Sequence, residues 1–180
     1  TTNTDFFAYQ YKPVLDFLDS PSNGLLIADE VGLGKTIEAG LIWTELRSRF
    51  DARKLLVVCP AVLRDKWQME LKHRFGVEGE IVDAATFSQR VRDKDPRKEM
   101  ALISSLNALR PQRGWEELEK GQLNNAGRVA QFLNEQQFEE PLFDLVIVDE
   151  AHYMRNPDTA TSKLGRFLRG ICEHMVLLSA

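Results

Sequence analysis

Two short groups of polar residues in this chain have the types and spacing for phosphate chemistry. The first is Gly32-Leu33-Gly34-Lys35-Thr36, in which glycine backbone freedom lets successive N–H groups point at one anion. Lys35 would bind the outer phosphates as a point charge, and the Thr36 hydroxyl would ligate Mg²⁺. The second is Asp149-Glu150, where Asp149 would hold Mg²⁺ and Glu150 would orient and deprotonate a water molecule. Together the two groups indicate hydrolysis of a nucleoside triphosphate.

Both groups follow apolar runs that are typical of buried strands in a parallel sheet. Residues 24–27 precede the glycine-rich group, and residues 143–148 precede the two carboxylates. A helix is predicted from Thr36 to about Phe50, so that its N-terminal dipole would face the phosphates. Since parallel sheets bind ligands at the carboxyl ends of their strands, we expect both groups to contribute to one site.

Each group taken alone has a simpler interpretation. The strict phosphate-loop pattern Gly-x-x-x-x-Gly-Lys-Ser/Thr is not met, because Asp29 stands where the first glycine should be. By itself the stretch also fits an ordinary glycine-containing turn before a helix. An Asp-Glu pair after a strand is usually a solvated strand end. The presence of both groups in one chain, each after a strand, favours the nucleotide site.

The same motifs resemble those of the Swi/Snf-type branch of superfamily 2 helicases. Residues 29–36 look like that branch's Asp-Glu-Met-Gly-Leu-Gly-Lys-Thr signature, in which Asp replaces the first glycine as a rule, so Asp29 becomes supporting evidence. Residues 149–152 resemble motif II, Arg155-Asn156 match the pair that follows it, and Tyr9-Gln10 resemble the aromatic-Gln pair that reads adenine. The unbroken run from Asp29 to Ile42 is most similar to bacterial RapA/HepA-like members, which remodel RNA polymerase complexes.

The resemblance assigns residues to three functions. Nucleotide binding is implied for Gln10, Asp29, Gly32, Leu33, Gly34, Lys35 and Thr36. Coupling of the γ-phosphate to the nucleic-acid side is implied for His152 and Ser179. Contact with the nucleic-acid backbone is implied for Pro60, Ala61, Ser104 and Ser105. For the two serines the alternative of capping the following helix has equal weight, and for Trp67 core packing is favoured over base stacking.

The predicted fold is a RecA-like, doubly wound and mainly parallel α/β sheet with helices on both faces. Further strands are expected at 54–59, weakly at 80–83, at 100–105 and at 174–180, the last one lying between the other two motif-bearing strands. A stripe of Leu63, Trp67, Leu71 and Phe75 predicts a helix on the sheet. Residues 111–141 read as a surface insertion, and Asn156 as a helix cap. Residues 1–180 are interpreted as one N-terminal ATP-binding lobe that ends at motif III.

Composition limits the classes of partner. With 23 basic and 27 acidic residues the net charge is −4, which argues against nucleic-acid binding by bulk charge, so any such contact must be local. An apolar fraction of 43% and a mean hydropathy of −0.30 fit a globular domain with a core.

Cys59 and Cys172 are expected to be buried free thiols. With no membrane-length apolar run and no signal-like start, we expect a cytoplasmic, nucleoid-associated bacterial protein.

These observations predict an ATP- and Mg²⁺-dependent lobe of a motor that moves on double-stranded DNA and remodels protein–nucleic acid complexes. The resemblance implies a second RecA-like lobe that supplies an arginine, so the lobe alone is expected to turn over ATP poorly. RNA polymerase or a subunit of a defence complex is the expected protein partner. Two alternatives stay open: a motor subunit of a restriction or defence complex, and a nucleotide-gated scaffold that does not translocate.

Overall fold

The structure is a computed structural model, and it describes residues 24–28, 34–135, 140–154, 156 and 158–179. Within these residues six strands form one sheet in the order β1-β6-β5-β2-β4-β3, and every pairing is parallel. The strands are β1 (Gly24–Ala28), β2 (Lys54–Cys59), β3 (Glu80–Ile81), β4 (Met100–Ser105), β5 (Phe143–Val148) and β6 (Cys172–Ser179). The α/β fold is confirmed, and β6 lies between β1 and β5 as predicted.

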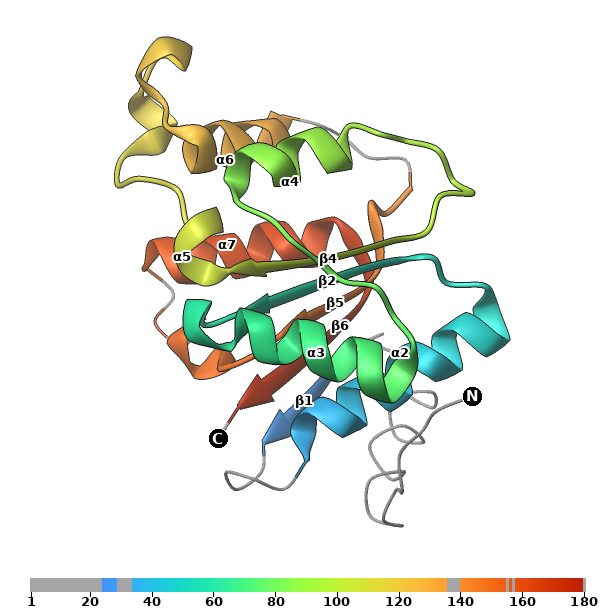
Figure 1. Ribbon diagram of the computed structural model, residues 1–180. Helices are drawn as coiled ribbons and strands as arrows, with labels where there is room; N and C mark the ends of the chain where they lie inside the picture. The colour runs from blue at the N-terminus through green and yellow to red at the C-terminus, as the bar shows by residue number, and fades with distance from the viewer. Residues whose placement is uncertain (1–23, 29–33, 136–139, 155, 157, 180) are drawn as a thin grey trace.

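Helices cover both faces of the sheet and make three layers (Figure 1). One face carries α2 (Lys35–Phe50) and α3 (Arg64–Phe75), and the other carries α4 (Ala84–Val91), α5 (Leu106–Leu109), α6 (Asn125–Glu135) and α7 (Ala160–Gly170). Alternate residues of the central strands enter the two cores, as in β2, where Leu55 and Val57 face α2 and α3 while Leu56 and Val58 face the other helices. The continuous apolar runs of β2 and β5 are therefore buried on both sides.

Two helix starts differ from the sequence prediction. Helix α7 is capped by Thr159, whose hydroxyl accepts a hydrogen bond from the Ser162 N–H at 3.1 Å, so the cap predicted at Asn156 is wrong. The Asn156 Oδ1 instead accepts from the Asp158 N–H at 3.2 Å, which makes a local turn before the helix. Helix α4 was not predicted, although Asp83 caps it by accepting from the Thr86 N–H at 2.8 Å.

The described part of the segment 111–141 packs against the helices of one sheet face. Its helix α6 lies against α4 and α7 and buries Ala126, Val129 and Leu133 in the core of that face. A short 3-10 turn at Trp115–Glu117 places the Trp115 ring edge-on to Phe167 of α7, with centroids 5.7 Å apart. The interpretation of this segment as a family-variable insertion stays a prediction.

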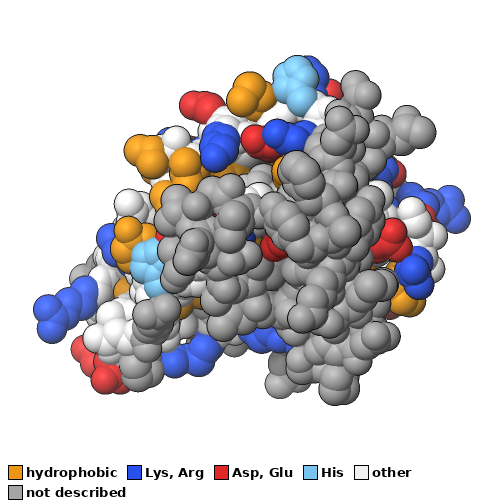
Figure 2. Space-filling model, turned by 90° about the horizontal axis from the view of Figure 1, so that it is seen from below, with side chains coloured by type: hydrophobic (Ala, Val, Ile, Leu, Met, Phe, Trp, Pro, Cys, Tyr) orange, Lys and Arg blue, Asp and Glu red, His pale blue; other side chains and the backbone are white. Residues whose placement is uncertain are grey.

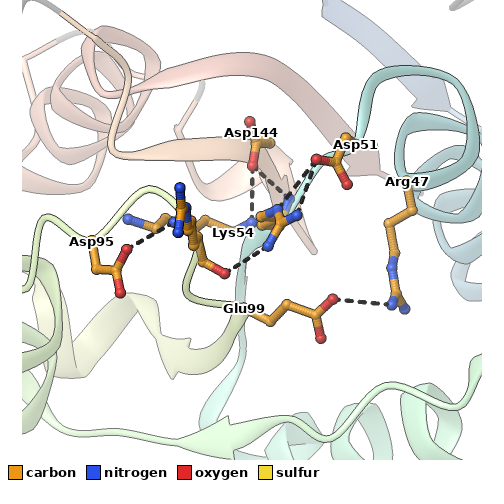
Figure 3. A network of polar contacts seen from close by, with 8 residues as sticks. Arg47, Asp51, Lys54, Asp95, Glu99 and Asp144 are labelled. Carbon is orange, nitrogen blue, oxygen red and sulfur yellow. Dashed lines mark hydrogen bonds and ion pairs between the residues drawn. The ribbon is translucent and has the colours of Figure 1, made fainter.

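A polar network closes the amino-terminal edge of the sheet, opposite the predicted site (Figure 3). Asp144 Oδ2, at the start of β5, accepts from the backbone N–H groups of Arg53 and Lys54 at 2.8 and 2.9 Å. The Arg53 guanidinium donates to the Arg97 carbonyl at 2.7 Å and to Asp51. These contacts join the β2 and β5 starts to the loop before β4, and they pair the Arg53 side chain with Asp51.

Candidate nucleotide site

The group predicted to bind phosphates comes between β1 and α2 in the chain, and its described part begins at Gly34. Gly34 has φ 79°, a left-handed conformation that glycine adopts without strain, and it caps α2. Lys35 follows in the first turn of α2, and its Nζ donates to the Ser179 carbonyl at 3.0 Å. This hydrogen bond joins the helix start to the end of β6. The predicted contacts of Gln10, Asp29, Gly32 and Leu33 lie outside the described residues.

The two motif II carboxylates leave the sheet at the end of β5. The Asp149 N–H donates to the Val58 carbonyl at 2.8 Å and extends the pairing with β2 by one residue. Glu150 has φ 56°, a left-handed conformation that is uncommon for a residue other than glycine and costs about 1–3 kcal/mol. Such strain gathers at functional sites, and here it lies in the turn between β5 and the 3-10 turn Ala151–Met154.

Three contacts orient the acidic pair. Asp149 Oδ2 accepts from the indole Nε1–H of Trp67 at 2.9 Å, and Asp149 Oδ1 accepts from the Glu150 N–H at 2.9 Å. Glu150 Oε2 lies 3.2 Å from His152 Nδ1, close enough for an ion pair although not aligned as a hydrogen bond. His152 is half-buried and its ring lies 4.4 Å, centroid to centroid, from that of Tyr153. Glu150 is thus held beside the predicted coupling histidine.

The predicted coupling residues His152 and Ser179 line one pocket between α7, β6 and the 3-10 turn Ala151–Met154. Ser179 is buried, and its carbonyl is the acceptor for Lys35. The start of α2 and the end of β6 therefore meet at the carboxyl edge, where β5 is the next strand. The sequence separations are large: Lys35 and Ser179 are 144 residues apart.

The oxygen donors at this edge suit Mg²⁺, which needs only one or two protein ligands. Among the described residues, no group of three or more His, Cys, Asp or Glu side chains could hold a metal ion. Mg²⁺ needs fewer protein ligands, since it keeps waters and binds through one or two protein oxygens together with substrate phosphates. The Asp149 carboxylate and the half-buried Thr36 in the first turn of α2 are such hard oxygen donors.

Both cysteines are buried free thiols, as predicted. Burial raises the pKa of the Cys59 thiol to about 12; the nearby Asp149 charge acts in the same direction, and Arg64 acts against it. Burial also raises the pKa of Cys172 to about 11, against the opposing effect of Arg169. Neither thiol is a nucleophile at neutral pH.

The residues predicted to contact nucleic acid divide into two kinds. Pro60 is half-buried, Ala61 is exposed, and the neighbouring Val62 is 87% exposed. In contrast, Ser104 is fully buried and donates to the Val82 carbonyl at 2.8 Å, while the buried Ser105 caps α5 by accepting from the Ala108 N–H at 3.0 Å. The capping alternative therefore describes Ser105, and both hydroxyls are engaged inside the protein.

A groove on the carboxyl edge of the sheet is lined in part by Pro60 and Ala61. Its lining includes Pro60, Ala61, Val62, Asn107, Arg110, Arg113, Tyr153 and Lys163. On the face seen in Figure 2, Lys and Arg side chains are scattered and interleaved with acids, in agreement with the low net charge. The three basic residues of the groove were not singled out from the sequence, because only the fold brings α5, the following turn and α7 together.

Trp67 is the main site residue whose contact the sequence did not indicate. Its predicted place in the core is confirmed, since it is 2% exposed on α3. The helical stripe nevertheless gave no sign that the indole N–H reaches Asp149, which lies 82 residues further along the chain. The one available signal was chemical, because a buried indole N–H usually finds an acceptor.

Comparison with known sequences places this site in a family. Residues 9–180 match the family described as SNF2-related domain. The chain is 31% identical over 153 residues to the RNA polymerase-associated proteins RapA of Yersinia pestis (strain Pestoides F) and of Sodalis glossinidius (strain morsitans). Each alignment covers 84% of this chain and 14% of the relative, so the chain spans about one seventh of the length of these proteins.

Solved structures share the fold. The chain is similar to the Sulfolobus solfataricus SWI2/SNF2 ATPase core in complex with dsDNA, with a TM-score of 0.66 and 18% identity over 99% of this chain and 32% of that chain. It is also similar to a nuclease-deletion mutant of the Type ISP restriction-modification enzyme LlaGI in complex with a DNA substrate mimic. There the TM-score is 0.63 and the identity 15%, over 98% of this chain and 17% of that chain. The predicted RecA-like fold is confirmed.

Proposed function

Because this chain belongs to the SNF2-related domain family, we propose that it is the ATP-binding lobe of a motor that uses ATP hydrolysis to move on double-stranded DNA and displace bound proteins. The observation that carries the proposal is the hydrogen bond from Lys35 to the Ser179 carbonyl, next to the strand that ends in Asp149 and Glu150. It supports the proposal because it ties Lys35 to the strand next to the one that ends in the two carboxylates, and phosphoryl transfer requires such groups near one another.

Each side chain has a defined part in the reaction. Lys35 and the N-terminal end of α2 bind the outer phosphates of ATP. Thr36 and Asp149 would hold Mg²⁺, which would supply charge compensation on the phosphates. Glu150 accepts a proton from the attacking water and orients it, and His152, 3.2 Å from this carboxylate, lies where a change at the γ-phosphate can be passed on.

Further parts of the motor are proposed to lie outside this chain. A second RecA-like lobe supplies an arginine to the transferring phosphate, so the 180-residue lobe by itself turns over ATP slowly. The groove is proposed as the surface that meets duplex DNA, since Arg110 and Arg113 there can bind phosphates locally, whereas Lys163 is paired with Glu116 of the same groove at 3.1 Å. Among the described residues no helix is long and apolar enough to cross a bilayer. We propose a cytoplasmic, nucleoid-associated protein.

The protein partner is proposed by similarity. The relatives at 31% identity are RNA polymerase-associated, which favours RNA polymerase as the partner of this motor. The likeness to a restriction-modification enzyme supports a second candidate, a motor of a defence complex. The two are distinguished by co-purification of RNA polymerase and by whether the parent chain carries a nuclease or methyltransferase domain.

The test is the steady-state ATPase rate of a protein extended through the second lobe, with linear duplex DNA, single-stranded DNA, RNA or no nucleic acid. We expect strong stimulation by duplex DNA, loss of turnover in Lys35→Ala, and loss of turnover with retained ATP binding in Glu150→Gln. Lys72→Ala is the matched control, because the substitution removes the same charge at a position away from the site. Lys72 is exposed, and its Nζ lies 3.8 Å from Glu78 Oε1. A rate indifferent to every nucleic acid would favour the nucleotide-gated scaffold instead.

A further inference from the structure

The indole of Trp67 makes one polar contact within an apolar core. Its ring is 2% exposed and packs among side chains of α2, α3 and the central strands. Its Nε1–H is the only hydrogen-bonding group of the side chain, and it donates to Asp149 Oδ2 at 2.9 Å. A ring that is clamped on all sides holds its N–H in a fixed direction, so the hydrogen bond also fixes the carboxylate.

The protein uses only part of the acceptor capacity of Asp149. An ionised carboxylate has two oxygens with about four lone-pair sites. Two of these sites are taken, one on Oδ2 by Trp67 and one on Oδ1 by the Glu150 N–H. Counting the hydrogen bonds of the described residues, one site on each oxygen is left, and the two bonds restrain the rotation of the carboxylate.

We propose that Trp67 is a positioning residue, which orients the Asp149 carboxylate so that it binds Mg²⁺ in the nucleotide site. This inference rests on the proposed function, because it gives Trp67 a role toward the metal of that same site. Partners that orient a metal-binding side chain typically contribute a factor of about 10–100 to metal affinity. Trp67 is therefore expected to affect Mg²⁺-dependent nucleotide binding by about tenfold or more.

Trp67→Phe is the variant that separates orientation from packing. It keeps an aromatic ring in the core and removes the N–H that reaches Asp149. A 3-benzothienylalanine at position 67 is the stricter version, since it preserves the two fused rings and replaces the N–H with sulfur. Both are expected to weaken nucleotide binding mainly when Mg²⁺ is present, because the polar contact that they remove is the one to Asp149.

Trp43 provides a matched control in the same core. It lies on α2, is 3% exposed and belongs to the same cluster of buried side chains as Trp67. Its indole nitrogen has no hydrogen-bond partner among the residues that the structure describes. Trp43→Phe thus makes the same truncation of a buried ring without removing a contact to the site.

The experiment measures the dissociation constant of a fluorescent ATP analogue for the 180-residue chain, with Mg²⁺ and with a chelator. The dissociation constant in chelator divided by the constant with Mg²⁺ measures how much the metal strengthens binding. This ratio is expected to fall about tenfold or more in Trp67→Phe and in the benzothienylalanine protein, and to stay at the wild-type value in Trp43→Phe. An unchanged ratio in the Trp67 proteins, with a clear Mg²⁺ effect in the wild type, would overturn the role of Trp67 alone. A wild type whose binding is indifferent to Mg²⁺ would overturn the proposed metal site together with it.

A second measurement does not depend on a Trp67 variant that folds. The chain has three tryptophans, so its ¹⁵N–¹H spectrum contains three indole signals, which Trp43→Phe and Trp115→Phe assign by elimination. When Mg²⁺ is added to the nucleotide-bound wild type, the Trp67 signal is expected to move and the Trp43 signal to stay. A Trp67 signal that does not respond would overturn the proposal.

Discussion

Gly40→Ala tests how closely the helix of the phosphate-binding turn packs against its neighbour. Gly40 is buried in α2, five residues after Lys35, and faces Phe75 at the end of α3. A Cβ added at Gly40 would lie 2.1 Å from Phe75 Cε2 and 2.2 Å from Cζ. Carbon atoms in contact prefer about 3.5–4.0 Å, so the ring or the helix would have to move by about 1.5 Å.

Two opposing effects set the size of the change. Alanine is favoured over glycine inside a helix by about 0.5–1 kcal/mol. Overpacking in a filled core costs about 1–3 kcal/mol. The clash is deep and the Phe75 ring is only 8% exposed, so the steric cost prevails. We expect Gly40→Ala to lower the free energy of unfolding by about 1–2 kcal/mol.

Urea denaturation of four proteins measures this: wild type, Gly40→Ala, Phe75→Ala and the double variant. Without the ring, the helix preference acts alone, so the second substitution in the Phe75→Ala background is expected to stabilise by about 0.5–1 kcal/mol. Gly170→Ala is the control, because Gly170 ends α7 with no atom within 4 Å of an added Cβ. A Gly40→Ala protein as stable as the wild type, or the same loss in both backgrounds, would refute the packing argument.

Two further predictions concern the amino-terminal edge and the buried thiols. Asp144→Ala removes the acceptor of the Arg53 and Lys54 N–H groups and is expected to lower the free energy of unfolding in urea by about 1–3 kcal/mol. Asp144→Asn keeps an oxygen and should cost less. Equal stability of the wild type and the two variants would contradict this. Cys59 and Cys172 keep their protons in the folded state above their ordinary pKa of 9.0, up to about 12 and 11, while the unfolded chain loses them. Proton binding by the two thiols therefore leaves the stability unchanged below pH 9 and lowers it as the pH rises above 9. In a plot of Tm against pH, the fall above pH 9 should be less steep for Cys59→Ala than for the wild type. Parallel curves for the two proteins would argue against this linkage.

Much of the fold and part of the site follow from local patterns in the sequence. The apolar runs before Lys35 and Asp149 predicted two parallel strands, of which β5 is central while β1 is at the edge of the described sheet. The four-residue stripe through Trp67 predicted α3, because burial of one helix face leaves a period in the sequence. The start of α7 was misplaced, since Asn156 and Thr159 can both cap a helix and the choice depends on where the helix meets the sheet.

Residue types at fixed spacing determined the chemistry: a lysine and hydroxyl after glycines, and a carboxylate pair after a strand. Only the tertiary structure decided which groups hold those side chains. The Lys35 bond to the Ser179 carbonyl and the Trp67 bond to Asp149 join positions 144 and 82 residues apart. Periodicity reports which side of an element is buried, but the partner of a single N–H depends on how separate elements dock, and this is a property of the folded chain alone.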